Sequence, residues 1–205
     1  MNKFSFSILL LSICLIVARN SMAQETPLLN WAKNFGANLY NAGDGIATDA
    51  SGNVYTTGNF FGTQDFDPGS GVFNMSVTGS DDGIFISKLN SNGDLVWAKS
   101  IKNVYNTADA IVVDASGNVI ITGFFDKGDV MDFDPGPGTF NVSALGYDMF
   151  VLKLNSDGEF IWMRHIRGTS AAAHVFPQSM ALDAAGNIYT TGYFQTTVDF
   201  DPGAG

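Results

Sequence analysis

Alternation of apolar and polar positions is the strongest signal along this chain of 205 residues. Residues 110–125, AIVVDASGNVIITGFF, form two runs of β-branched and aromatic residues around a Ser-Gly-Asn turn. Residues 149–166, MFVLKLNSDGEFIWMRHI, form two more runs around Asn-Ser-Asp-Gly. Such runs predict strands, and the turn-forming segments between them predict β-hairpins. No helical period stands out after residue 23, so we expect an all-β fold.

The two hairpins recur along the chain. The first motif has three copies, DASGNVYTTG, DASGNVIITG and DAAGNIYTTG, at residues 49–58, 114–123 and 183–192. The second motif has two copies, at residues 85–101 and 150–166. Trp31, Trp97 and Trp162 keep the same register, at intervals of 66 and 65 residues. Tandem units of about four antiparallel strands predict the blades of a β-propeller.

The recurring segments resemble the SBBP repeats, a family of bacterial β-propellers, in the variant with a DFDPG insertion. The resemblance rests on DASGNVYTTG followed by DGIFISKLNSNGDLVWAK, and it extends over residues 28–205. It implies a propeller fold and a secreted protein more than it implies an activity, because most such proteins have no assigned chemistry.

The repeat also predicts how the chain is divided. The expected parts are the end of one blade at 28–35, blades at about 44–101 and 109–166, and half a blade at 177–205. Such an incomplete set of blades does not close a ring of roughly four to eight. We therefore expect an open ring that is part of a longer protein, with assembly of several copies into a homo-oligomer as the alternative.

The first 23 residues have the pattern of a signal peptide. Lys3 precedes a long apolar run, and Ser21-Met22-Ala23 fits the cleavage rule for small residues. The run is shorter than a typical membrane span, although an uncleaved anchor is the alternative. We expect residues 24–205 to be secreted, or held at the surface of a bacterial cell. The only cysteine, Cys14, lies in the apolar run, so the mature chain would have no disulfide and no Cys-based zinc site.

Charge narrows the classes of partner. The net charge is −10 at pH 7, and removal of residues 1–23 takes away Lys3 and Arg19 and makes it more negative. A strongly acidic chain does not neutralise phosphates, which argues against nucleic acid and anionic membrane surfaces. Protein and carbohydrate remain as expected partners.

The pentapeptide DFDPG occurs three times, at 65–69, 132–136 and 199–203. Its order favours a structural turn, in which Phe is an anchor, Pro fixes φ and Gly accepts a turn conformation. The alternative is a Ca²⁺ site with oxygen ligands from Asp65, Asp67, Asp132, Asp134, Asp199 and Asp201. Acidic neighbours, Asp126 and Asp129, lie near the second copy alone, which weakens a shared metal site. No other cofactor is expected.

Other polar residues carry weaker signals. Asp44 and Asp109 align with Gln178 in the third copy, which argues against a repeated metal role. His165 and His174 are not at zinc-ligand spacing, and we expect the second to be a surface residue. Trp97 and Trp162 are expected to pack between blades, with sugar stacking as the alternative. No nucleophile elbow or phosphate-binding glycine loop is present.

The sequence therefore predicts a secreted, non-catalytic β-propeller segment that serves as a binding or structural scaffold. One alternative is a carbohydrate-active or other hydrolytic propeller whose catalytic site lies in sequence outside this chain. Another is a structural module stabilised by calcium. No catalytic constellation is found. The paired acids of DFDPG recur in every unit, and a residue pair repeated in this way serves the repeat more often than it serves catalysis.

Overall fold

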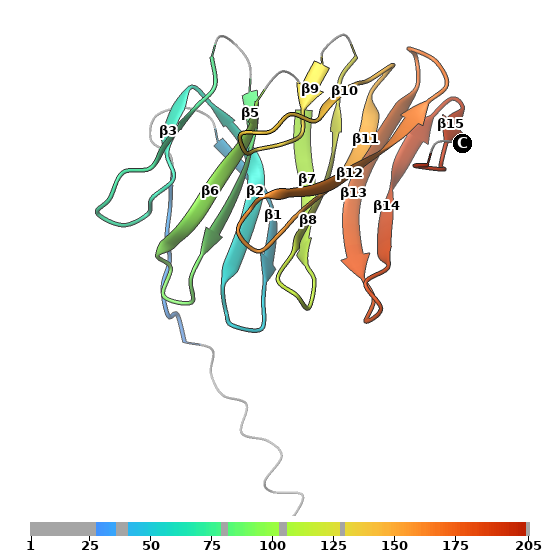
Figure 1. The fold of residues 1–205 in the computed structure, drawn as a ribbon. Coiled ribbons are helices and arrows are strands. Elements are labelled where there is room, and N and C mark those ends of the chain that lie inside the picture. The colour runs from blue at the N-terminus through green and yellow to red at the C-terminus, as the bar shows by residue number, and fades with distance from the viewer. Residues whose placement is uncertain (1–27, 36–40, 79–81, 103–105, 128–129, 204–205) are drawn as a thin grey trace, which may run out of the picture. The chain divides into compact units, whose positions relative to one another are not determined.

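The computed structural model describes residues 28–35, 41–78, 82–102, 106–127 and 130–203 (Figure 1). All regular elements in these ranges are strands, which confirms the predicted all-β class. Within the same ranges, no helix is long and apolar enough to span a membrane. The predicted signal peptide, residues 1–23, lies outside the described residues.

The first sheet has four antiparallel strands in the order β1–β2–β5–β6. Their bounds are Asn41–Thr48 for β1, Val54–Phe61 for β2, Asp82–Leu89 for β5 and Leu95–Lys102 for β6. A short antiparallel pair, β3 (Thr63–Asp65) and β4 (Asn74–Ser76), lies between β2 and β5 in the sequence. The first DFDPG copy begins at the end of β3.

The second sheet repeats this arrangement, with the strand order β15–β12–β11–β8–β7. Its strands are β7 (Asn106–Val113), β8 (Val119–Phe125), β11 (Asp148–Leu154), β12 (Phe160–Gly168) and β15 (Val198–Asp199). The inserted pair is β9 (Val130–Asp132) with β10 (Asn141–Ser143). The short β15 comes from the third repeat, so it extends a sheet otherwise built from the second.

The third repeat contributes a hairpin, which we call the C-terminal hairpin, of β13 (His174–Leu182) and β14 (Ile188–Gln195). The equivalent strands β2 and β8 each have a second neighbour, β5 and β11. Among the described residues, no strand pairs with the corresponding edge of β14. This strand therefore has one edge without a ladder.

The first turn of each repeat is closed by an aspartate. Asp49 Oδ1 accepts hydrogen bonds from the backbone N–H groups of Ser51 and Asn53, at 2.9 and 3.0 Å. Gly52 has a φ of 77°, which a residue without a Cβ adopts with no strain. Asp114 and Asp183 make the same bonds in the other two copies. The sequence-based expectation that these aspartates cap the turns is confirmed.

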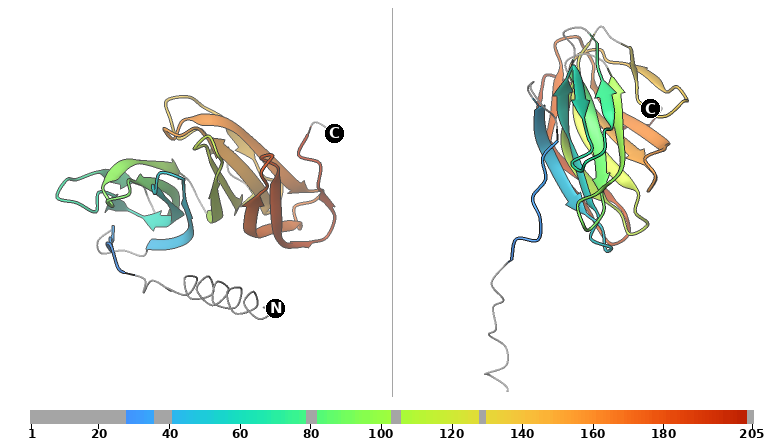
Figure 2. Two further views of the ribbon diagram at one scale, coloured as in Figure 1. Left: turned by 90° about the horizontal axis from the view of Figure 1, so that it is seen from below. Right: turned by 90° about the vertical axis from the view of Figure 1, so that its left-hand side faces the viewer.

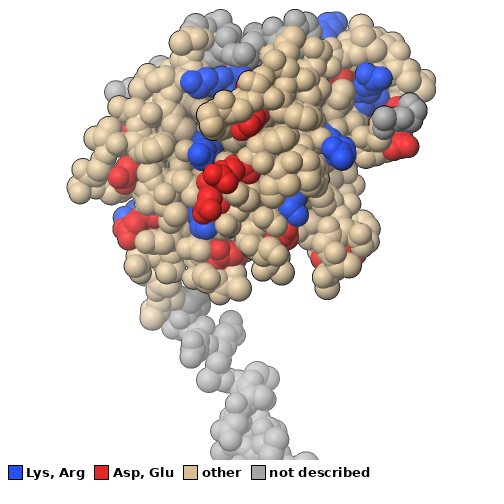
Figure 3. All heavy atoms as spheres, in the orientation of Figure 1, with Lys and Arg blue, Asp and Glu red and all other residues tan. Residues whose placement is uncertain are grey.

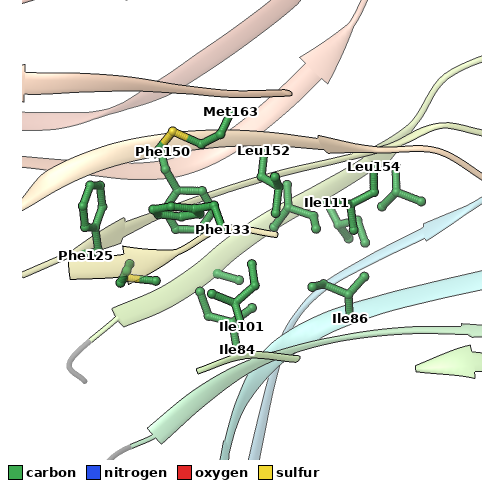
Figure 4. Packing of buried hydrophobic residues seen from close by; sticks show 14 of the residues in the cluster. Ile84, Ile86, Ile101, Ile111, Phe125, Phe133, Phe150, Leu152, Leu154 and Met163 are labelled. Carbon is green, nitrogen blue, oxygen red and sulfur yellow. The ribbon is translucent and has the colours of Figure 1, made fainter. Parts of the chain in front are cut away.

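The main core lies between the first and second sheets, which stand side by side with the C-terminal hairpin next in line (Figure 2). In Figure 4, Ile84, Ile86 and Ile101 of the first sheet face the apolar side chains of the second. Those of the second sheet include Ile111, Phe125, Phe150, Leu152, Leu154 and Met163, and Phe133, which follows β9, joins the same cluster. Trp97 is partly buried beside this core, and its Nε1–H donates to the carbonyl oxygen of Ser156 at 3.0 Å. The expected packing of Trp97 between sheets is therefore observed.

The chain divides into two units, residues 1–32 and 33–205, and every strand belongs to the second. Residues 28–35, for which the sequence predicts the last strand of a blade, are in no strand. In the second unit Phe35 packs against Phe66 and Phe85, with ring centroids 5.6 and 5.7 Å away. This contact covers part of the first sheet on the face opposite the main core.

Candidate functional site

The first strand of each repeat carries a β-bulge at the same place. The register shifts between Gly43 and Gly45 in β1, between Ala108 and Ala110 in β7, and between Pro177 and Ser179 in β13. The extra residues are Asp44, Asp109 and Gln178. A bulge turns its extra residue away from the regular alternation of the strand, which is one way a sheet aims a polar side chain.

A glycine in the neighbouring strand makes room for each bulge. A Cβ added to Gly58 would overlap the carbonyl oxygen of Ala42. A Cβ added to Gly123 would overlap the carbonyl oxygen of Thr107, and a Cβ added to Gly192 would overlap the carbonyl oxygen of Phe176. Each glycine ends the Thr-Gly dipeptide found in all three copies of the first motif. The repeated glycine is therefore explained by a close approach of two backbones.

The three bulges open onto one cleft. Its volume is about 580 Å³, and it is lined by β1, β7 and β13, the first strand of each repeat. Asp44, Asp109 and Gln178 are all among its lining residues. Positions that are 65 or more residues apart in the sequence thus meet at one surface. This cleft is the site that the fold builds most directly from the repeat.

Burial sets the electrostatics of the cleft. It raises the pKa of Asp109 to about 6, while the Thr107 hydroxyl opposes this shift and the nearby charge of Asp44 adds to it. The Thr107 hydroxyl lies 3.0 Å from each carboxylate oxygen of Asp109. The pKa of Asp44 is also raised by burial. The folded chain therefore favours the neutral acids at this surface more than the unfolded chain does.

This shift predicts a stability effect of Asp109→Asn that depends on pH. The folded-state pKa of Asp109 lies above its ordinary value of 3.8, so the folded chain binds the proton more tightly. The wild-type chain therefore loses stability relative to the variant as pH rises from about 4 to about 6. In urea unfolding, we expect Asp109→Asn to match wild type near pH 4 and to be more stable at pH 7.5.

The exposed Asp157, in the turn between β11 and β12, offers a matched control. Asp157→Asn removes the same charge away from the cleft, and we expect no comparable trend. A difference between Asp109→Asn and wild type that is constant from pH 4 to pH 7.5 would contradict the assignment.

The DFDPG copies have a common backbone geometry. Asp65 Oδ1 accepts the N–H groups of Asp67 and Phe73, at 3.0 and 2.8 Å. Asp67 Oδ1 accepts the N–H of Gly69 at 2.7 Å. The bond from Phe73, followed by that from Asp67, lowers the pKa of Asp65. The first copy is therefore a turn held by two successive carboxylates.

The second copy repeats these bonds, and the third repeats part of them. Asp132 Oδ1 accepts the N–H groups of Asp134 and Phe140, and Asp134 Oδ1 accepts that of Gly136. In the third copy, Asp199 Oδ1 accepts the N–H of Asp201 at 2.9 Å, and Asp201 Oδ1 accepts that of Gly203 at 2.9 Å. One oxygen of each aspartate is thus used by the backbone.

Calcium remains an alternative use of these carboxylates. Within the described ranges, no three Asp, Glu, His or Cys side chains are grouped so that they could hold a metal ion. Asp199 and Asp201 line a cleft of about 510 Å³ together with Arg164 and Arg167, whose charges oppose cation binding. The geometry favours the turn over a metal site.

We expect the melting temperature to be the same in millimolar Ca²⁺ and in a chelator. The carboxylates already accept backbone N–H groups, and Ca²⁺ needs about six to eight oxygen ligands. Differential scanning calorimetry in both conditions measures this, with Mg²⁺ as a control for ionic strength. A rise of several degrees that Ca²⁺ alone produces would instead assign the six aspartates to a calcium site.

The structure also shows a buried pair that the sequence did not predict. Asp148 is fully buried, and its Oδ2 lies 3.2 Å from His165 Nε2. The backbone N–H groups of Leu145 and Gly168 donate to the same carboxylate. These three polar contacts of Asp148 all lie within the second sheet and its connections. This arrangement is that of a structural anchor.

His174 is not the surface residue that the sequence predicts. It is half-buried, and its ring packs edge-on against Tyr147 and Phe176, with centroids 4.8 and 5.6 Å away. Phe176 lies two residues along the same strand, β13, so the alternation of a strand places it on the same face as His174. Tyr147 lies in the β10–β11 connection, and no spacing in the sequence indicates its contact with the histidine.

Comparison with known proteins supports a propeller-like repeat architecture. No family model matches the chain. The chain is similar to an uncharacterized WD repeat-containing protein, L264, of Acanthamoeba polyphaga mimivirus, with 28% identity over 188 aligned residues. The match covers 80% of this chain and 13% of that relative, so the chain spans a small part of the relative's length. WD repeats are propeller blades of four strands, which agrees with the two complete sheets seen here.

Proposed function

We propose that this chain is part of a secreted, non-catalytic β-propeller repeat protein that acts as a binding scaffold outside the cell or at its surface. Its partner would be a protein or a carbohydrate. The cleft lined by β1, β7 and β13 is the single observation that carries the proposal. Three repeats contribute equivalent bulged residues to it, so the repeat itself builds a surface for a ligand.

The placement of the DFDPG carboxylates argues against a hydrolytic pair at these residues. Hydrolysis by paired carboxylates needs one acid and one base at a single place. The six DFDPG aspartates are instead distributed over three copies, and each bonds to its own backbone. The WD-repeat similarity is also in keeping with a scaffold that binds other proteins.

Surface charge supports a partner that is not a polyanion. Figure 3 shows acidic and basic side chains interspersed on one face of the molecule, without a broad basic area. The net charge of −10 opposes association with phosphate-rich surfaces. Neutral glycans, and proteins without a strong negative charge, are free of this repulsion.

Binding is tested with residues 24–205, the chain without its predicted signal peptide, on arrays of glycans and of bacterial surface proteins. We expect the double variant Asp44→Asn with Asp109→Asn to weaken capture of the array partner by about tenfold or more. Asp157→Asn, on an exposed turn, should leave capture unchanged. Capture that is insensitive to the cleft variants would refute the site, and cleavage of an arrayed glycan would favour the hydrolytic alternative.

Secretion is tested separately, in a bacterium with a general secretory pathway. The full chain should reach the periplasm or medium, with a new N-terminus at Gln24. A charge in the apolar run, as in Leu10→Arg, should retain the chain in the cytoplasm with Met1 or Asn2 first. Recovery of wild-type chain from the cytoplasm with its first 23 residues intact would oppose the proposal.

A further inference from the structure

The turn between β5 and β6 contains an asparagine that is followed by glycine. Asn92–Gly93 is the one Asn-Gly pair in the sequence. Asn92 is exposed, and Gly93 has a φ of 80°, which a residue without a Cβ adopts with no strain. A following glycine also leaves the asparagine side chain unhindered access to the next backbone nitrogen. Asparagine is a thermolabile residue, and this setting exposes it to reaction with its own backbone.

The asparagines in the first turn of each repeat differ from Asn92 in two respects. Asn53, Asn118 and Asn187 each donate the side-chain amide to the aspartate of their own turn. They are followed by valine, valine and isoleucine, whose branched side chains crowd the next backbone nitrogen. These three asparagines are therefore comparisons for Asn92 within the same molecule.

The turn around Asn92 is held closed by Asn90. Asn90 Oδ1 accepts hydrogen bonds from the backbone N–H groups of Asn92 and Asp94, at 2.9 and 3.0 Å. The carbonyl oxygen of Asn90 accepts the N–H of Gly93 at 2.9 Å. Because the nitrogen next to Asn92 is engaged in this bond, it reaches the Asn92 side chain only when the turn opens locally. The Asn90 cap therefore sets how often the reactive geometry forms.

The second repeat has an aspartate at the place of Asn92. In that turn, Asn155 Oδ1 accepts the backbone N–H groups of Asp157 and Glu159, both at 2.9 Å. Gly158 has a φ of 76°, and its N–H donates to the carbonyl oxygen of Asn155 at 3.0 Å. An aspartate is therefore compatible with the backbone bonds that hold the turn of the first repeat.

We propose that Asn92 is a site of spontaneous deamidation whose rate is controlled by the Asn90 cap. The Gly93 nitrogen attacks Cγ of Asn92, a C–N bond forms, the proton of that nitrogen passes to solvent, and Nδ2 leaves as ammonia. Water then opens the cyclic imide at either of its carbonyl carbons. One opening gives aspartate, and the other gives isoaspartate, in which the main chain runs through the side-chain carbon. The net change replaces the amide by a carboxylate and adds a negative charge.

The two products should differ in their effect on the β5–β6 hairpin. Aspartate at position 92 reproduces the turn of the second repeat, so we expect Asn92→Asp to leave the melting temperature unchanged. Isoaspartate adds a methylene group to the main chain and displaces the Gly93 N–H from the carbonyl oxygen of Asn90. The isoaspartate form, separated by chromatography, should melt about 2–4 °C lower, as for the loss of one hydrogen bond.

The reaction is followed by mass spectrometry of proteolytic peptides after the folded chain has been kept in heavy-oxygen water at mildly alkaline pH. Uptake of the heavy isotope separates this reaction from deamidation during digestion. We expect conversion at Asn92 and none at Asn53 or Asn118 over the same time. Equal conversion at all three residues would overturn the proposal. So would an unchanged Asn92 after a free peptide of residues 82–102 in the same tube has converted.

Asn90→Ala tests the control by the cap. The variant lacks the acceptor for two backbone N–H groups, so Asn92 should convert about fivefold faster or more, the factor expected from loss of a hydrogen bond. Asn155→Ala makes the same change in the second repeat and should leave the rate at Asn92 unchanged. Exchange of the Gly93 amide with deuterium reports the opening of the turn, and it should rise in the same proportion as the rate. An Asn90→Ala chain that opens more often but converts no faster than wild type would overturn the proposal.

Discussion

Replacing Phe133 by alanine is expected to lower the free energy of unfolding by about 3–5 kcal/mol, the range for a buried aromatic residue. The Phe133 ring is fully buried and belongs to the core between the two sheets. Its centroid lies 5.2 Å from that of Phe125 and 5.1 Å from that of Phe150. Alanine would leave a cavity in a place where both neighbours are fixed on central strands, β8 and β11.

Phe200→Ala is the matched control, because it changes the same position of the same motif in the third copy. Phe200 is 57% exposed, so we expect a loss of less than about 1 kcal/mol. Urea unfolding followed by far-UV circular dichroism measures both variants. Similar losses for Phe133→Ala and Phe200→Ala would contradict the different burial of the two rings.

Replacing Gly58 by alanine is expected to cost roughly 3 kcal/mol or more, at the upper end for overpacking. The new Cβ would overlap the carbonyl oxygen of Ala42, which belongs to the neighbouring backbone. A backbone carbonyl in a strand pair cannot rotate away from the new Cβ as a flexible side chain can. Relief would require the bulge at Asp44 to move, and with it one wall of the cleft.

Gly43→Ala provides the comparison on the opposite strand of the same pair. A Cβ built on Gly43 has no atom within 4 Å, so the substitution should change stability by no more than about 1 kcal/mol. Thermal unfolding of the two variants and of wild type measures both changes in stability. If Gly43→Ala were the more damaging of the two, the explanation of the repeated Thr-Gly dipeptide would be wrong.

The sequence predicted the hairpins because their signals are local. Asp114, Gly117 and Asn118 form a turn with β-branched runs on both sides, and the structure has β7 and β8 at those runs. The role of Phe133 as the anchor of DFDPG could also be predicted, since it lies between two acids and before a Pro-Gly turn. Each of these inferences needs only a few neighbouring residues.

The cleft could not be predicted in the same way. Asp44, Asp109 and Gln178 were seen to be equivalent, but their differing chemistry argued against a shared metal role. The bulges at these residues are defined by pairing with the neighbouring strand, which the sequence does not give. The Asp148–His165 contact depends on how β11 pairs with β12. Register over a hairpin, and not sequence spacing, brings these two side chains together.

Amide hydrogen exchange tests the central claim, that the repeats build equivalent strand pairs and that, within the described ranges, β14 is paired along one edge alone. In the folded chain, β2 and β8 lie between two strands, so their ladder amides should exchange slowly throughout. In β14, we expect slow exchange at those amides that bond to β13 and fast exchange at those on the other edge. Uniform protection along β14, or fast exchange throughout β8, would contradict the account.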